Sequence, residues 1–117
     1  MKNNEVQKMA QNHVQKGDAM PWTNGTGSAV ASGDVVVVSA MVCVALGDIA
    51  DGEEGNLATC EVFEVAKEAP LVIAQGDIVY WDAVNSNIDK TDTNVRAGKA
   101  FAAAASADTT VLVKLGA

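Results

Sequence analysis

A five-residue phrase recurs four times in this chain: an apolar residue, two variable residues, Gly and Asp. The copies end in Gly17-Asp18, Gly33-Asp34, Gly47-Asp48 and Gly76-Asp77. Gly adopts the positive φ that a tight turn often needs, and an Asp side chain accepts hydrogen bonds from the turn backbone. Two of the copies run directly into strand-like sequence, because Val35–Val38 and Ile78–Trp81 consist of β-branched and aromatic residues. The phrase therefore predicts a chain of turns and short strands.

The second and fourth copies head two similar halves of the sequence. Gly33 and Gly76 lie 43 positions apart, and after each of them the chain reads turn, strand, strand, loop and long strand. The second half carries an additional polar segment, 84–96, rich in Asn, Asp and Thr. We interpret this as one internal duplication; the alternative is coincidence within sequence rich in Ala, Val and Gly.

These patterns predict an all-β protein, a small β-sandwich or barrel of short antiparallel strands. A polar N-terminal arm over residues 1–16 precedes a single β domain over residues 17–117. Asn24-Gly25 predicts a hairpin turn. The stretch 100–104 is rich in Ala, which favours helix, but the duplication aligns it with 41–46 and predicts a strand. The expected strands are Ala29–Ala31, Val35–Val38, Met41–Leu46, Leu57–Ala66, Leu71–Ile73, Ile78–Asp82, Ala100–Ala104 and Thr109–Leu115.

The composition limits the core. The chain has 117 residues, of which 49% are hydrophobic but only 4% aromatic, so the core must consist of Val, Ala, Leu and Ile. Such small side chains bury little area each, and a domain of this size buries a modest core. Several apolar segments exceed what that core can cover, which predicts burial against a partner.

Charge and hydropathy argue against two classes of partner. The net charge of −7 has the wrong sign for neutralising phosphates, so we expect no nucleic-acid partner. No segment approaches the length of apolar sequence that spans a membrane, and the polar N-terminus does not resemble a secretory signal. We expect a soluble protein, made in the cytoplasm, with no membrane partner.

The sequence offers little catalytic or metal-binding chemistry. His13 is the sole histidine, no zinc-ligand spacing or phosphate-binding Gly-rich loop occurs, and we predict no enzyme activity, no cofactor and no metal site. The acidic loop 48–55 lacks the alternating ligand pattern of calcium loops, so we interpret it as a solvated hairpin loop instead of a calcium site. Cys43 and Cys60 are interpreted as reduced thiols, although a disulfide is conceivable if their strands pair.

Several of these segments together carry a resemblance. They are Gly33–Val38, Cys43–Leu46, Asp51–Gly55, Val62–Lys67, Gly76–Asp82, Gly98–Ala100 and Val111–Leu115. This pattern resembles the tailed-phage capsid cement, or head decoration, family over about residues 14–117. The combination of Val-Phe-Glu-Val with Gly-Asp-Ile-Val-Tyr-Trp-Asp is its most specific part. Some members of that family carry a recombinase label, against which the missing phosphate-binding loop argues.

The resemblance implies a small β-rich structural protein on the outer face of a phage head, in the virion. Its partners would be the major capsid protein and further copies of itself, as a homotrimer. We expect the arm, which we infer to become ordered on contact, and the segment after it to contribute to capsid or subunit contacts. The candidate contact residues are Lys2, Val6, Met9, His13, Met20, Trp22 and Trp81.

The alternative from another class is a ligand-binding β module that recognises glycans through Trp81 and the 84–96 insertion. A small enzyme is a third reading, but no trio of converging titratable residues supports it.

Overall fold

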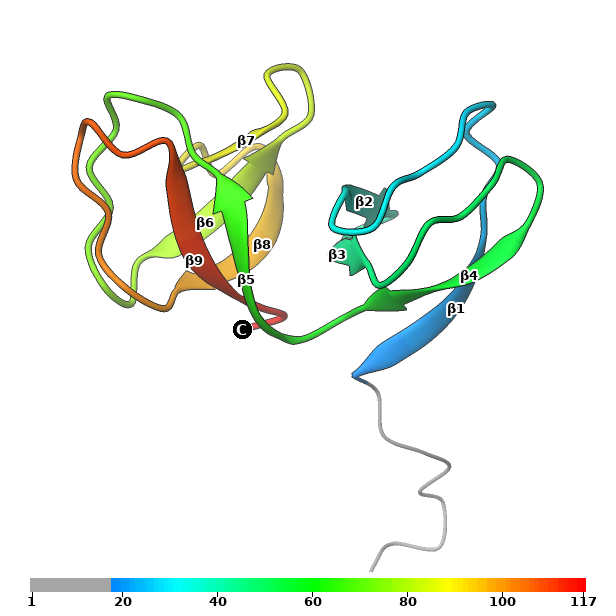
Figure 1. The fold of residues 1–117 in the computed structure, drawn as a ribbon. Helices are drawn as coiled ribbons and strands as arrows, with labels where there is room; N and C mark the ends of the chain where they lie inside the picture. The colour runs from blue at the N-terminus through cyan, green and yellow to red at the C-terminus, as the bar shows by residue number, and fades with distance from the viewer. Residues whose placement is uncertain (1–17) are drawn as a thin grey trace, which may run out of the picture.

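The structure is a computed structural model that describes residues 18–117 (Figure 1). This range forms two antiparallel sheets and contains no helix, which confirms the all-β prediction. The predicted arm over residues 1–16 lies outside the described residues. The strands are β1 (Ala19–Thr23), β2 (Val35–Val38), β3 (Met41–Ala45), β4 (Glu54–Ala58), β5 (Glu61–Ala66), β6 (Ile78–Asp82), β7 (Asn87–Asp89), β8 (Val95–Ala100) and β9 (Thr110–Leu115).

The first sheet, in the order β1-β4-β3-β2, forms the first lobe, residues 18–58. Its inner face covers a small cluster in which Cys43 and Leu57 are fully buried and Ile49 is 3% exposed. Met20 and Trp22 of β1 pack against the same cluster. This lobe therefore has a core of its own, built mostly from side chains no larger than Leu.

The second sheet, in the order β5-β9-β8-β6-β7, forms the second lobe, residues 61–117 (Figure 1). Its two outer strands approach each other, because Lys67, directly after β5, bridges Ile88 of β7 in parallel. The sheet thus curls toward a small barrel around Ile73, Val79 and Val113, all fully buried. We call this lobe the barrel.

Strand β3 joins the two lobes. Because alternate side chains of a strand point to opposite faces, Cys43 and Ala45 face the first lobe's core, while Val42 and Val44 belong to the hydrophobic cluster of the barrel. The main contact between the sheets is that of β3 with β8. The described part of the protein is elongated, with extents of 52 × 34 × 22 Å.

The hydrogen bonds confirm the duplication. In the first half, the Gly33 amide donates to the Ala45 carbonyl, and the Val30 amide donates to the Ile49 carbonyl. In the second half, the Gly76 amide donates in the same way to the Ala100 carbonyl, and the Ile73 amide to the Ala104 carbonyl. The sheet orders also correspond, since β1-β4-β3-β2 maps onto β5-β9-β8-β6. Strand β7 is extra and lies in the predicted insertion.

The same hydrogen bonds correct the alignment of the two halves. Ala45 corresponds to Ala100, so β3 corresponds to β8 and not to the predicted strand Ala100–Ala104. Only the first and last residues of that stretch pair as in a strand. Ala100 is the last residue of β8, and Ala104 forms an isolated bridge to Ile73. The error arose because Val95–Ala100 contains Arg, Gly and Lys, and its pairing with two neighbouring strands outweighs its low strand propensity.

Three further expectations about strands were wrong. Asn24-Gly25 forms no hairpin, because β1 pairs with β4 instead of with the next strand along the chain. The predicted strand 57–66 is two strands, since the chain passes from one lobe to the other at Thr59 and Cys60, and Glu61 has a φ of 78°. The predicted strands 29–31 and 71–73 are reduced to isolated bridges at Val30 and Ile73.

Candidate contact surfaces

The described candidate contact residues divide between the two lobes. Met20 and Trp22 are half-buried on β1, against the first lobe's core, whereas Trp81 is half-buried on β6 and packs against the barrel's core. The structure therefore does not bring the three together. Lys2, Val6, Met9 and His13 lie outside the described residues.

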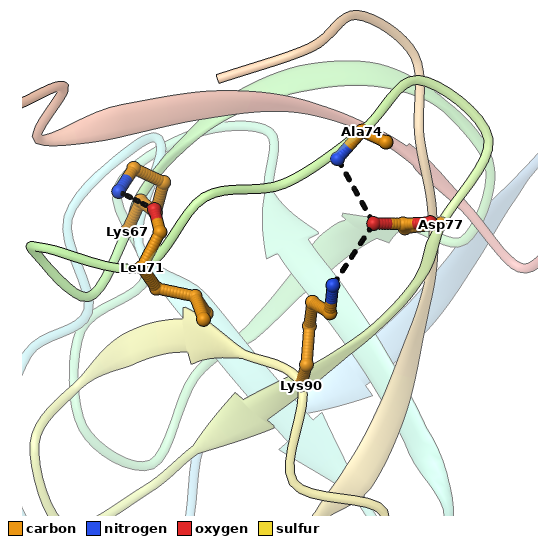
Figure 2. A network of polar contacts seen from close by, with 5 residues as sticks. All are labelled: Lys67, Leu71, Ala74, Asp77 and Lys90. Carbon is orange, nitrogen blue, oxygen red and sulfur yellow. Dashed lines mark hydrogen bonds and ion pairs between the residues drawn. The ribbon is translucent and has the colours of Figure 1, made fainter. Parts of the chain in front are cut away.

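The Asp residues of the repeated phrase organise turns. Asp34 accepts a hydrogen bond from the Ala31 amide at 3.0 Å, and Asp77 accepts one from the Ala74 amide at 2.9 Å. Asp77 also pairs with Lys90 at 3.1 Å (Figure 2). The Ala74 amide and then Lys90 lower the pKa of Asp77, so its stabilising effect is present at neutral pH and lost as pH falls through that lowered pKa. These carboxylates are engaged structurally.

In both lobes, the residue directly after the first strand, β1 or β5, has a buried polar side chain. Asn24 is fully buried and donates to the carbonyls of Ser28 and Ile49, at 2.8 and 3.0 Å. Lys67 is 4% exposed, and its ammonium donates to the carbonyl of Glu68. It also donates to the carbonyl of Leu71 (Figure 2). Because a buried polar side chain needs hydrogen-bond partners, each of these two residues bonds to the loop that follows it and holds that loop in place. The sequence signalled Asn24 only as a turn residue and gave no sign of Lys67.

The acidic loop holds the backbone of the loop between β1 and β2. Asp48 accepts from the Ser32 amide at 2.9 Å, and Asp51 accepts from the Gly27 amide at 3.1 Å. Their carboxylates thus serve different turns. Across residues 18–117, no group of three or more His, Cys, Asp or Glu side chains is arranged to hold a metal ion.

Both cysteines are free thiols. Cys43 lies in the first lobe's core, where burial raises its pKa and disfavours the reactive thiolate. Cys60 is half-buried at the passage between the lobes. The conceivable disulfide between them is not formed.

Two grooves lie where the lobes meet. One, of about 330 Å³, is lined by Met41, Thr59, Arg96 and the C-terminal Gly116 and Ala117 among others. The other, of about 430 Å³, is more polar and is lined by Asp34, Glu64, Trp81 and Ser86 among others. Neither contains a set of groups arranged for proton transfer or nucleophilic attack.

An exposed sheet surface carries an unusual combination of side chains. Strands β6, β8, β9 and β5 lie side by side, and their register places Ile78, Lys99, Lys114 and Val62 in one row across them. Phe101, 53% exposed, donates its amide to the carbonyl of Leu112 next to this row. We call this surface the barrel face: Val62, Ile78, Lys99, Phe101, Leu112 and Lys114.

The first lobe presents a different surface. Residues 18–58 contain six Asp and Glu residues and no Lys or Arg. On the side of the sheet opposite Leu57, the residues Pro21, Thr23, Glu54 and Asn56 are exposed, and Leu46, 49% exposed, donates its amide to the carbonyl of Asn56. We call this surface, consisting of those five residues, the acidic-lobe face.

A family model described as phage cement protein matches residues 14–115, which is most of the chain. Among curated proteins and among solved structures, nothing matches. No helix of the described residues could cross a membrane.

Proposed function

The chain belongs to the phage cement protein family, and on that premise we propose that it binds the outer surface of a phage head at junctions between major capsid protein subunits and stabilises the shell. The family match over residues 14–115 is the observation that carries this proposal. The family indicates a structural role in the virion capsid. Our proposal adds to this role the position of the protein on the head and its partner, the major capsid protein.

The surface composition of the protein supports a binding role. Nine large hydrophobic side chains are exposed in the described residues, although the chain is small: Val37, Met41, Leu46, Val62, Val72, Ile78, Val84, Phe101 and Leu112. Four of them, Val62, Ile78, Phe101 and Leu112, lie together on the barrel face, and contiguous apolar surface commonly marks an interaction site. The Asp carboxylates described above hold turns, and neither groove has its polar groups arranged for reaction, so binding accounts for these features better than catalysis does.

The proposed mechanism is mechanical. A head pressurised by packaged genome fails where neighbouring capsid subunits separate, so a protein that touches both sides of such a junction adds buried area that must be lost on rupture. Repetition by the symmetry of the shell multiplies weak contacts. A homotrimer, with three equivalent attachment points, would gain further from this avidity. We propose that state for the bound protein, with no nucleic-acid or membrane partner.

Removal and restoration of the protein test this function. We expect heads stripped of it to release their genome at a lower temperature than complete heads, and added purified protein to restore the original release temperature. Genome release monitored with a DNA-binding dye during heating measures the effect. Equal release temperatures with and without the protein would contradict the proposal. Serum albumin, also acidic but unrelated, is the control for non-specific protection.

The N-terminal arm provides a second test. We propose that residues 1–16, which carry three Lys and one Glu, contact the capsid or a neighbouring copy, with Met20 and Trp22 continuing that contact. Deletion of residues 1–15 should lower the number of copies per head severalfold and leave the unfolding temperature unchanged. Quantitative gel densitometry of repurified heads measures occupancy. Full occupancy by the shortened protein would remove the arm from the mechanism.

One specific observation favours a second candidate function, glycan binding. Trp81 lines a groove together with Asp34, Glu64 and Ser86, and an aromatic ring beside carboxylate and hydroxyl groups is compatible with glycan binding. Binding of the free protein to a glycan array, lost in Trp81→Ala, would favour a ligand-binding module. Absence of glycan binding together with restored head stability would favour the cement function.

A further inference from the structure

The barrel face contains two like charges in direct opposition. Lys99 on β8 and Lys114 on β9 are cross-strand partners, and both are exposed. Within residues 18–117, the one salt bridge joins Lys90 and Asp77, so neither of these lysines has an ion-pair partner there. Like charges directly opposite each other destabilise a sheet. A carboxylate brought by a partner would remove that repulsion.

The surroundings of the two lysines are mostly apolar; the exception is Glu64, which is exposed and is the cross-strand partner of Leu112. Ile78 lies beside Lys99 and Val62 beside Lys114 in the same row, while Phe101 and Leu112 lie in the neighbouring row. These four side chains are 37–53% exposed. A positive pair surrounded mostly by apolar side chains is complementary to a partner surface that places a carboxylate among apolar groups. Burial of the apolar side chains in such a contact strengthens the charge interaction.

The same chain carries the complementary surface. The acidic-lobe face places Glu54 on the same side of the sheet as Leu46 and Pro21, in a lobe whose described residues include no Lys or Arg. The two faces belong to different sheets of one molecule. Contact between two unlike surfaces of identical chains is heterologous, and it forms a closed ring when the rotation between copies permits.

We propose that the barrel face of one copy binds the acidic-lobe face of the next copy, with Glu54 placed against Lys99 and Lys114. This deepens the proposed function, since it gives the surfaces through which a ring such as the proposed trimer would form. It is a property of the free protein and can be tested without heads. Failure of this contact would therefore leave the capsid-binding proposal standing.

Charge reversal in the full-length protein tests the contact. We expect sedimentation velocity to show concentration-dependent association of the wild type that weakens at high salt, and Lys99→Glu to raise the dissociation constant at least about tenfold. Lys90→Glu is the control for charge reversal on an exposed lysine outside the barrel face. It also breaks the ion pair with Asp77, so we expect it to lower the unfolding temperature but to associate like the wild type. Thermal unfolding of each variant verifies the fold.

Mixing two charge-reversed variants tests whether Glu54 of one copy is the partner of Lys99 of another. Glu54→Lys should associate as weakly as Lys99→Glu, whereas an equimolar mixture of the two variants should recover most of the association, since each supplies a reversed charge to the other. A monomeric wild type, or association unaffected by Lys99→Glu, would overturn the proposal. So would Lys99→Glu that associates normally but binds stripped heads poorly, because the barrel face would then contact the capsid protein.

Discussion

Replacement of Gly98 by Ala should destabilise the protein by about 4 kcal/mol or more, enough to prevent folding of a small domain. Gly98 lies on β8 between β6 and β9, with a φ of 153° that side-chain-bearing residues rarely adopt. A methyl group there would overlap the carbonyl oxygen of Lys114 on β9. Because that oxygen is backbone, the overlap can be relieved only by separating two strands of the barrel.

Gly25→Ala is the matched control for this substitution. Gly25 has no atom within 4 Å of an added Cβ, and its φ is not in the positive region. We expect it to change the free energy of unfolding by less than about 0.5 kcal/mol. Urea unfolding followed by tryptophan fluorescence measures both variants. A Gly98→Ala protein as stable as the control would mean that β8 and β9 are not paired in the described register.

Replacement of Asn24 by Leu should cost about 3 kcal/mol of stability, the penalty for leaving several buried polar groups without partners. The Asn24 carbonyl oxygen accepts from the amide and the hydroxyl of Thr26, and its amide nitrogen donates to the carbonyls of Ser28 and Ile49. Leu has a similar size but makes none of these bonds. The loop between β1 and β2 should therefore open together with the first lobe's core.

Two comparisons sharpen the Asn24 prediction. Asn85→Leu removes an exposed amide that bonds to Asp82, and we expect a loss below about 1 kcal/mol. Hydrogen exchange of the Ile49 amide, which donates to the carbonyl of Val30, reports on the loop directly. Strong protection of that amide in Asn24→Leu would show that the loop does not depend on the side chain.

The sequence predicted those strands whose local propensity agrees with their pairing. Val35–Val38, Ile78–Asp82 and Thr110–Leu115 are rich in β-branched or aromatic residues and were predicted nearly to their ends. Strands β1 and β8 were missed because Pro21 and Gly98 lower strand propensity. Both form through pairing with distant segments, which a single sequence does not reveal.

The contact surfaces were less predictable than the strands. The aromatic candidates Trp22 and Trp81 were identifiable by size, but each packs partly against a core. The opposition of Lys99 and Lys114 depends on the register of β8 and β9, and the sequence predicted the strand at 100–104 instead of 95–100. A one-residue change of register exchanges the faces of a strand, so such a surface emerges only from the pairing.

The two halves differ most at one corner. Ser39 and Ala40 close the β2–β3 turn, whereas the corresponding connection between Trp81 and Arg96 is far longer and includes β7. The same arrangement of strands thus accommodates both a two-residue turn and a long connection at this corner, and the sheet is kept in both halves. A guest peptide spliced at Ser39–Ala40 would follow a precedent that the molecule already contains, which makes this corner a natural position for multivalent epitope display on particles.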